Sequence, residues 1–243
     1  MVMKMIDPAL LANGVKYIQF EDDFFTYVDA DEWTLTATDS GTAAVTDAVG
    51  GVLLLAASDG TVADNDESYL HTTHEIFKFA DEKPLIFEAR LQWTEANAGA
   101  VANVAAGLCN AVAANTIVDN GAGMRADFSG AVIYRKDGST NWNVIYSDST
   151  TQTDVELTAA NSLTGAAISA TKSTDYTLRI ECIPRSSTKM NVSFWIDGVN
   201  VYVMNDVTYA SATEMEVFFG AKTGAATEAL VVKPDYVQCV QAR

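Results

Sequence analysis

Hydrophobic and polar residues alternate with a period of two along several short segments of this chain, which is the pattern of β-strands with one buried face. The clearest case is segment 85–93, where every odd position from Leu85 to Trp93 is apolar. The positions between them include Glu88, Arg90 and Gln92, which point to the opposite face. This alternation predicts a half-buried strand in an antiparallel sheet.

The last third of the chain shows the same period in segments 175–183, 190–197 and 235–241. The turn pair Asp197-Gly198 lies between the apolar runs of residues 194–196 and 199–201. An Asp-Gly pair in this setting is a strong hairpin signal, because a two-residue type I′ turn needs positive φ at both positions. We therefore expect antiparallel strands joined by a tight turn.

Other apolar segments are separated by turns rich in Asp, Gly and Ser, and are also expected to form strands. They comprise residues 17–28, 33–36, 52–56, 69–72, 76–79, 127–136, 142–146, 201–204, 214–221 and 229–232. Segment 96–114 is rich in alanine, which favours helix, but we expect a strand there because its neighbours are strands. Residues 148–174 are expected to form weak strands at a sheet edge.

These patterns predict one all-β domain, an antiparallel two-sheet sandwich over residues 17–243, preceded by an arm at residues 1–16. The length of 243 residues and the hydrophobic fraction of 49% are enough for a single large core. The arm carries apolar residues that would need burial against this domain or a neighbouring subunit. We expect contacts with a partner from Met3, Met5, Leu10 and Leu11.

The formal net charge is −17 at pH 7, which argues against binding to nucleic acid or to an anionic membrane surface. The three cysteines, Cys109, Cys182 and Cys239, are odd in number and have no paired spacing. They are expected to be reduced and mostly buried, which indicates assembly in a cytoplasm.

No motif for catalysis is recognisable. The two histidines, His71 and His74, lack the spacing of a zinc site or a triad, and Gly121–Gly123 is expected to be a turn rather than a dinucleotide loop. Glu214 and Glu216 share a strand face but are expected to point to solvent. We therefore expect no enzyme, no cofactor and no transition-metal site.

Two binding sites remain as weaker hypotheses. Acidic turns could hold Ca²⁺, and Asp64 and Asp66 would then be its ligands. Tyr134, Trp142 and Tyr146 flank a turn and could stack on a glycan, although core packing is the favoured explanation of aromatic residues on strands.

The order of these segments resembles the concanavalin A-like (laminin-G-like) jelly roll, especially its versions in virion proteins of tailed bacteriophages. The resemblance rests on the aromatic and acidic opening at residues 20–24, the strands at 84–91, 104–108 and 175–181, the hairpin at 194–199 and the closing strand at 235–240.

That resemblance implies a non-enzymatic decoration (cement) protein that stabilises the outer surface of a phage head. Its partner would be the major capsid protein. We expect a homotrimer, because closed symmetry avoids open-ended polymerisation, and assembly in the host cytoplasm, because the cysteines are expected to be reduced. The alternative is a lectin-like carbohydrate-binding module or an adhesin of a phage tail or fibre. Both readings share the sandwich and differ in the partner.

Overall fold

The structure is a computed structural model that describes residues 16–46, 48, 50–97, 101–227 and 229–243. These residues form eighteen strands and no helix. The strands are β1 (Tyr17–Asp22), β2 (Trp33–Ala37), β3 (Thr42–Thr46), β4 (Val52–Ala56), β5 (Glu67–Thr72), β6 (Phe77–Lys78), β7 (Leu85–Thr94), β8 (Asn103–Cys109), β9 (Ile117–Val118), β10 (Gly123–Met124), β11 (Ser129–Arg135), β12 (Asn143–Asp148), β13 (Gln152–Glu156), β14 (Tyr176–Ser186), β15 (Lys189–Ile196), β16 (Val199–Thr208), β17 (Glu214–Lys222) and β18 (Val231–Ala242).

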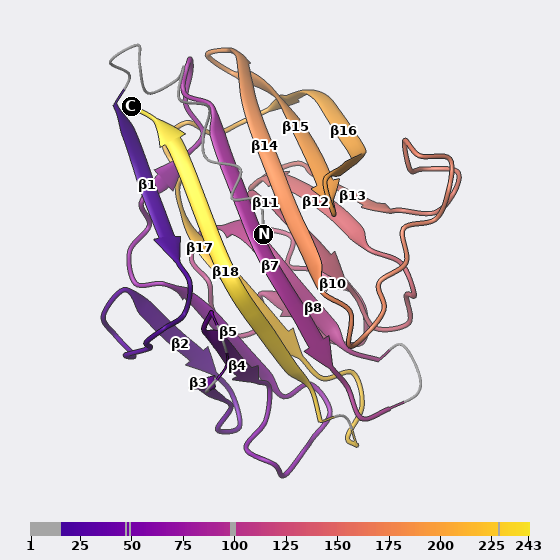
Figure 1. The fold of residues 1–243 in the computed structure, drawn as a ribbon. Coiled ribbons are helices and arrows are strands. Elements are labelled where there is room, and N and C mark those ends of the chain that lie inside the picture. Colours follow the sequence, from indigo (N-terminus) through magenta and orange to yellow (C-terminus); the bar gives the residue numbers. More distant parts are fainter. Residues whose placement is uncertain (1–15, 47, 49, 98–100, 228) are drawn as a thin grey trace.

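Two antiparallel sheets of eight strands each lie face to face (Figure 1). The first sheet has the order β16-β15-β14-β7-β18-β4-β3, with β1 also pairing with β18. The second has the order β13-β12-β11-β8-β17-β5-β2, with β6 also pairing with β17. Strands that are neighbours in space are often distant in sequence, as in a jelly roll. The predicted all-β, two-sheet sandwich is therefore confirmed.

The first sheet has one buried face and one partly exposed face. Its buried side chains meet in register across three strands, where Phe87 of β7 is opposite Ile180 of β14, which is opposite Phe194 of β15. All three belong to the main core and are fully buried. The residues between them, such as Glu88 and Arg179, face outward, as the alternation predicts.

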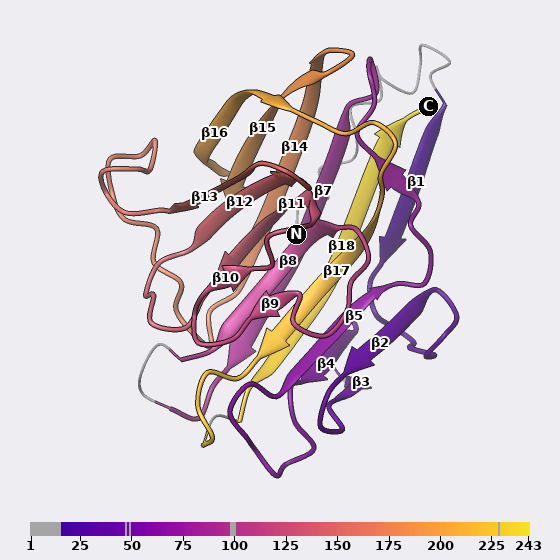
Figure 2. The same ribbon diagram turned by 180° about the vertical axis from the view of Figure 1, so that it is seen from behind.

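The central strands of the second sheet are buried on both faces. Every residue of β8 and β11 is buried, because segment 110–128 packs over the outer face of the sheet. Figure 2 shows β9 and β10 of this segment in front of the sheet. Ile117, Met124 and Phe128 of the segment form a second hydrophobic cluster with residues of the sheet. The segment is therefore a third layer on top of the two sheets.

Several local predictions are confirmed. Asp197 and Gly198 have φ values of 52° and 78° and connect β15 to β16, as the Asp-Gly signal requires. The alanine-rich segment contains strand β8, and residues 121 and 122 lie in the turn of the β9–β10 hairpin, directly before Gly123 begins β10. The three cysteines are free and buried.

Some boundaries differ from the prediction. Strand β1 ends at Asp22 rather than continuing to residue 28, because Phe24 takes a φ of 51° and its N–H donates to the Asp22 side chain at 2.7 Å. Of residues 148–174, only β13 is a strand beyond the end of β12, and it lies at the sheet edge. Within the described residues, no helix is long and apolar enough to cross a membrane.

The predicted arm at residues 1–16 lies almost entirely outside the described residues. This includes Met3, Met5, Leu10 and Leu11, so their expected contacts stay predictions.

Candidate functional site

The three aromatic residues expected to stack on a glycan are not at the surface. Tyr134 and Trp142 have 0% and Tyr146 has 3% of their surface exposed. The expected stacking platform therefore does not form in this structure. The physical reason is that Tyr134 points to the face that segment 110–128 covers, whereas Trp142 and Tyr146 belong to the main core between the two sheets.

Each of these rings has a structural role instead. Tyr134 lies beneath segment 110–128 and donates to Asp154 Oδ2 at 2.6 Å. Trp142 packs edge-on against the rings of Trp93 and Tyr176, with centroids 5.5 and 5.1 Å away. The Tyr146 hydroxyl donates to a backbone carbonyl, that of Thr208, at 2.6 Å.

The two aspartates named as calcium ligands differ in their surroundings. Asp66 is fully buried, and its Oδ2 accepts the backbone N–H of Ala63 at 2.7 Å, which stabilises the turn before β5. Asp64 is exposed. The described part of the chain contains no group of three or more His, Cys, Asp or Glu side chains arranged to hold a metal ion.

The histidines lie in separate environments. His71 is buried on β5, and its Nδ1 is 3.2 Å from Oε2 of Glu216 on β17. Glu216 was expected to face solvent but is only 8% exposed, because segment 110–128 covers it and the N–H of Val112 donates to it. His74 lies beyond the end of β5 and is exposed.

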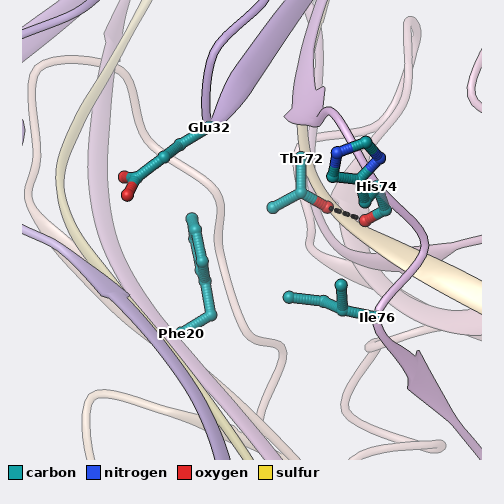
Figure 3. Close-up of a pocket in the computed structure, with 5 residues that line it drawn as sticks. All are labelled: Phe20, Glu32, Thr72, His74 and Ile76. Atoms are coloured by element: carbon teal, nitrogen blue, oxygen red, sulfur yellow. Dashed lines mark hydrogen bonds between the residues drawn. The ribbon is translucent and has the colours of Figure 1, made fainter.

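Beside His74 is a small cavity of about 180 Å³, lined by Phe20, Glu32, Thr72, His74 and Ile76. Figure 3 shows Glu32 on one side and Thr72 and His74 on the other, with Phe20 and Ile76 forming apolar walls. The Thr72 hydroxyl donates to the carbonyl of His74 at 3.0 Å. Most of the surface that lines the cavity is apolar.

A second hollow, of about 150 Å³, lies on the outer face of the first sheet and is here called the Trp195 groove. The alternation of β7, β14 and β15 places polar side chains on this face, and the β15–β16 turn borders it. The groove is lined by Glu88, Thr177, Arg179, Glu181, Trp195 and Gly198.

The strand register explains how these residues meet. Trp195 is directly opposite Arg179, and Arg179 is directly opposite Glu88. Thr177 and Glu181 are two residues to either side of Arg179 and so share its face. An indole, a guanidinium, a hydroxyl and two carboxylates thus converge on one open surface.

The Arg179 guanidinium connects the two carboxylates of the groove. Its Nη2 is 2.6 Å from Glu181 Oε1 and its Nη1 is 3.3 Å from Glu88 Oε2. Tyr236 donates its hydroxyl to Glu88 Oε1 at 2.9 Å. Burial and the Glu88 charge raise the pKa of Tyr236, so this hydroxyl stays protonated and the network stays connected.

A second ion-pair cluster adjoins the groove, because Arg90 is opposite Thr177 in the register. The Arg90 guanidinium contacts the carboxylates of Asp175 and Asp235, each at 2.8 Å. Burial works against the charged form of Arg90, but the two carboxylates outweigh it and raise its pKa. The polar surface therefore extends across β14, β7 and β18.

Trp195 is half-buried and is the aromatic residue of the groove. Its Nε1 is enclosed and donates to no atom among the described residues. A ligand would therefore meet the indole through its ring rather than through its N–H.

The sequence contained a signal for this site, although the search for aromatic residues beside a turn did not find it. In β15 the buried positions are Met190, Val192, Phe194 and Ile196, so Trp195 falls on the polar face with Asn191 and Ser193. A tryptophan on the polar face of an alternating strand is unusual, because large aromatic residues are normally buried.

Comparison with protein-family models finds no match, and comparison with curated protein sequences finds none either. Solved structures do share the fold. The carbohydrate recognition domain of Emp47p is 13% identical, with a TM-score of 0.58, and the alignment covers 91% of this chain and 93% of that domain.

Two enzymes also share it. An endo-β-1,4-glucuronan lyase from Trichoderma reesei is 13% identical, with a TM-score of 0.58 over 90% of this chain and 94% of the lyase. An endo-1,3-β-glucanase from Streptomyces sioyaensis is 18% identical, with a TM-score of 0.58 over 93% and 96%. At these identities the likeness shows the fold, a lectin-type or concanavalin A-like jelly-roll sandwich.

These structures correct one prediction. The inference that the chain is not an enzyme is wrong, because a lyase and a glucanase share this fold. The absence of a recognisable acid motif therefore does not exclude catalysis.

Proposed function

We propose that this protein binds a carbohydrate in the Trp195 groove. The observation that carries the proposal is the partly exposed indole beside a guanidinium, a hydroxyl and two carboxylates on an open sheet face. Sugars present apolar C–H faces and many hydroxyls, and sites with an aromatic wall and a few converging polar groups suit them.

The fold supports this proposal over other ligand classes. The solved structures with the same sandwich include a carbohydrate recognition domain and two enzymes whose names specify polysaccharide substrates. The net charge of −17 disfavours nucleic acid as the ligand.

The groove fits this role better than the cavity beside His74. The cavity has two apolar walls, and its Thr72 hydroxyl is already bonded to a carbonyl. The groove instead is lined by polar side chains from three adjacent strands beside one aromatic ring.

The narrower expectation, a decoration protein on a phage head, stays a prediction from the sequence. It includes the homotrimer, the contact with a major capsid protein and the virion location. The solved structures reported above are not phage head proteins, and they favour the lectin-like alternative.

The proposal is tested by isothermal titration calorimetry with a panel of oligosaccharides. Trp195→Ala removes the stacking surface, and we expect it to weaken binding by about 2 kcal/mol, roughly thirtyfold. Phe25→Ala is the control, because Phe25 is 68% exposed and does not line the groove, and its affinity should equal that of wild type.

The same mixtures are then analysed for shorter oligosaccharides, which shows whether bound sugar is also cleaved. If no oligosaccharide binds, or if Trp195→Ala binds as tightly as wild type, the proposal is wrong.

A further inference from the structure

We propose that the Trp195 groove prefers a sugar that carries a protonated amine over the matched neutral or acidic sugar. This inference rests on the proposed function, since it names the ligand class of the same site. It follows from three features: the charge of the groove and its surroundings, the hydrogen-bonding groups left unused, and the position of the indole.

The first feature is an excess of negative charge. The ion-pair network of the groove and the adjoining cluster contains four carboxylates, Glu88, Glu181, Asp175 and Asp235, and two guanidiniums. Its net charge is therefore negative, as is that of the whole chain. A cationic ligand is attracted by this field and an anionic ligand is repelled.

The second feature is that the cationic donors are already in use. Nε of Arg179 donates to Glu181 Oε1 at 2.7 Å, Nη2 forms an ion pair with the same oxygen at 2.6 Å, and Nη1 donates to Glu88 Oε2 at 3.3 Å. An acidic sugar would have to displace these carboxylates to gain the paired hydrogen bonds that Arg offers to carboxylates. The groove is thus poorly suited to a uronate or a sulfated sugar.

An acceptor, by contrast, is left over. Both Arg179 contacts to Glu181 use Oε1, and no described residue donates to Oε2. The Glu181 side chain is 23% exposed and lines the groove, so a ligand in the groove can approach its carboxylate. A charge-assisted hydrogen bond from an ammonium to this oxygen is stronger than one from a neutral hydroxyl.

The third feature is the position of the indole. Trp195 is opposite Arg179, and Glu181 is two residues further along β14 on the same face. An aromatic ring beside a carboxylate is a recurrent setting for ammonium groups, because the ring face attracts cations. A sugar stacked on Trp195 would place a substituent within reach of Glu181.

The test compares β-1,4-linked tetrasaccharides that share a backbone and differ in one group. Cellotetraose is neutral, the chitosan tetramer carries free amines, the chitin tetramer carries N-acetyl groups, and the glucuronan tetramer carries carboxylates. Calorimetry in mildly acidic buffer at low salt should show the chitosan tetramer binding about tenfold more tightly than cellotetraose. The glucuronan tetramer should bind most weakly.

Two variants locate the preference. Glu181→Gln should remove the preference, so that this variant binds the chitosan tetramer no more tightly than it binds cellotetraose. Glu214→Gln removes one negative charge from an exposed residue on β17 of the second sheet and should leave the preference intact. If Glu181→Gln does not fold, the ranking of the four sugars by the wild-type protein decides.

The outcomes separate the two proposals. If cellotetraose or the glucuronan tetramer binds as tightly as the chitosan tetramer and Trp195→Ala still weakens binding, the amine preference is wrong but the proposed carbohydrate site is supported. A tenfold preference that persists in Glu181→Gln also overturns the inference. If none of the tetrasaccharides binds, the proposed function itself fails.

Discussion

Trp195 differs from the other tryptophans of the chain in its environment. The other three tryptophans, Trp33, Trp93 and Trp142, are almost fully buried and pack against other aromatic rings. Trp195 alone lies on the outer face of the first sheet, beside charged residues. Its environment suits a ligand rather than the core.

A second residue with an unusual environment is Lys222, a fully buried cation under segment 110–128. Its ammonium contacts Glu67 Oε2 at 2.9 Å, Asn115 Oδ1 at 2.8 Å and the Ile117 carbonyl at 3.0 Å, and it also pairs with Asp119. Burial and the nearby Glu67 raise the pKa of Tyr69, so its hydroxyl stays protonated and donates to Glu67. These contacts attach the segment to β17 and β5.

We predict that Lys222→Met destabilises the protein by about 3–5 kcal/mol, because it leaves the buried Glu67 carboxylate without its cation. Urea unfolding measures the change. Adding Glu67→Gln to this variant should recover part of the loss, since the uncompensated charge is then removed. Lys83→Met, at an exposed position, serves as control and should stay within about 0.5 kcal/mol of wild type. An equally small effect of Lys222→Met would show that the pair does not hold the segment.

At the scale of elements, local alternation predicted the strands well. β7, β14 and β15 follow their hydrophobic period, and the Asp197-Gly198 turn fixes the hairpin between β15 and β16. In each case the deciding interactions lie within a few residues along the chain or on one face of one strand.

The sequence did not predict the cover formed by segment 110–128. Its contacts join residues far apart in the chain, such as Ile117 with Tyr69 and Val112 with Glu216. This segment buries Tyr134, which was expected to bind a glycan, and Glu216, which was expected to face solvent. Sequence alternation cannot tell whether the polar face of a strand meets water or another segment.

The turn between β12 and β13 contains a carboxylate, that of Asp148, whose pKa is shifted by hydrogen bonds. Asp148 Oδ1 accepts hydrogen bonds from the N–H groups of Thr150 and Thr151 and from the Thr150 hydroxyl. Burial alone would raise the pKa of Asp148, but these bonds outweigh it and lower the pKa.

A lowered pKa means that the ionised form is favoured in the folded state. The stabilisation is therefore complete above the unfolded value of about 3.9 and is lost as the pH falls through the lower folded value. We predict that Asp148→Asn lowers the melting temperature at neutral pH and that the difference from wild type shrinks below pH ~3. Thermal unfolding followed by circular dichroism across this range measures it. A difference that grows toward acid pH would contradict the assignment.

At the scale of the whole molecule, the sequence supplied the fold class and the resemblance to concanavalin A-like jelly rolls, and the structure confirms both. The functional site was harder to predict from the sequence, because the aromatic residues nearest a turn proved to be core residues. The groove appears only when β7, β14 and β15 are placed side by side in register.

The central claim is that a sugar binds on the outer face of the first sheet at Trp195. The most direct measurement is an NMR titration that follows the indole N–H signals of the four tryptophans, with Trp195→Phe identifying its own signal, while the chitosan tetramer or cellotetraose is added. We predict that the Trp195 signal and the backbone amides of residues 177–181 and 195–198 shift with the added sugar, while the other three indole signals stay in place. Saturable shifts confined to segment 110–128 or to the cavity beside His74, or no shift at all, would contradict the account.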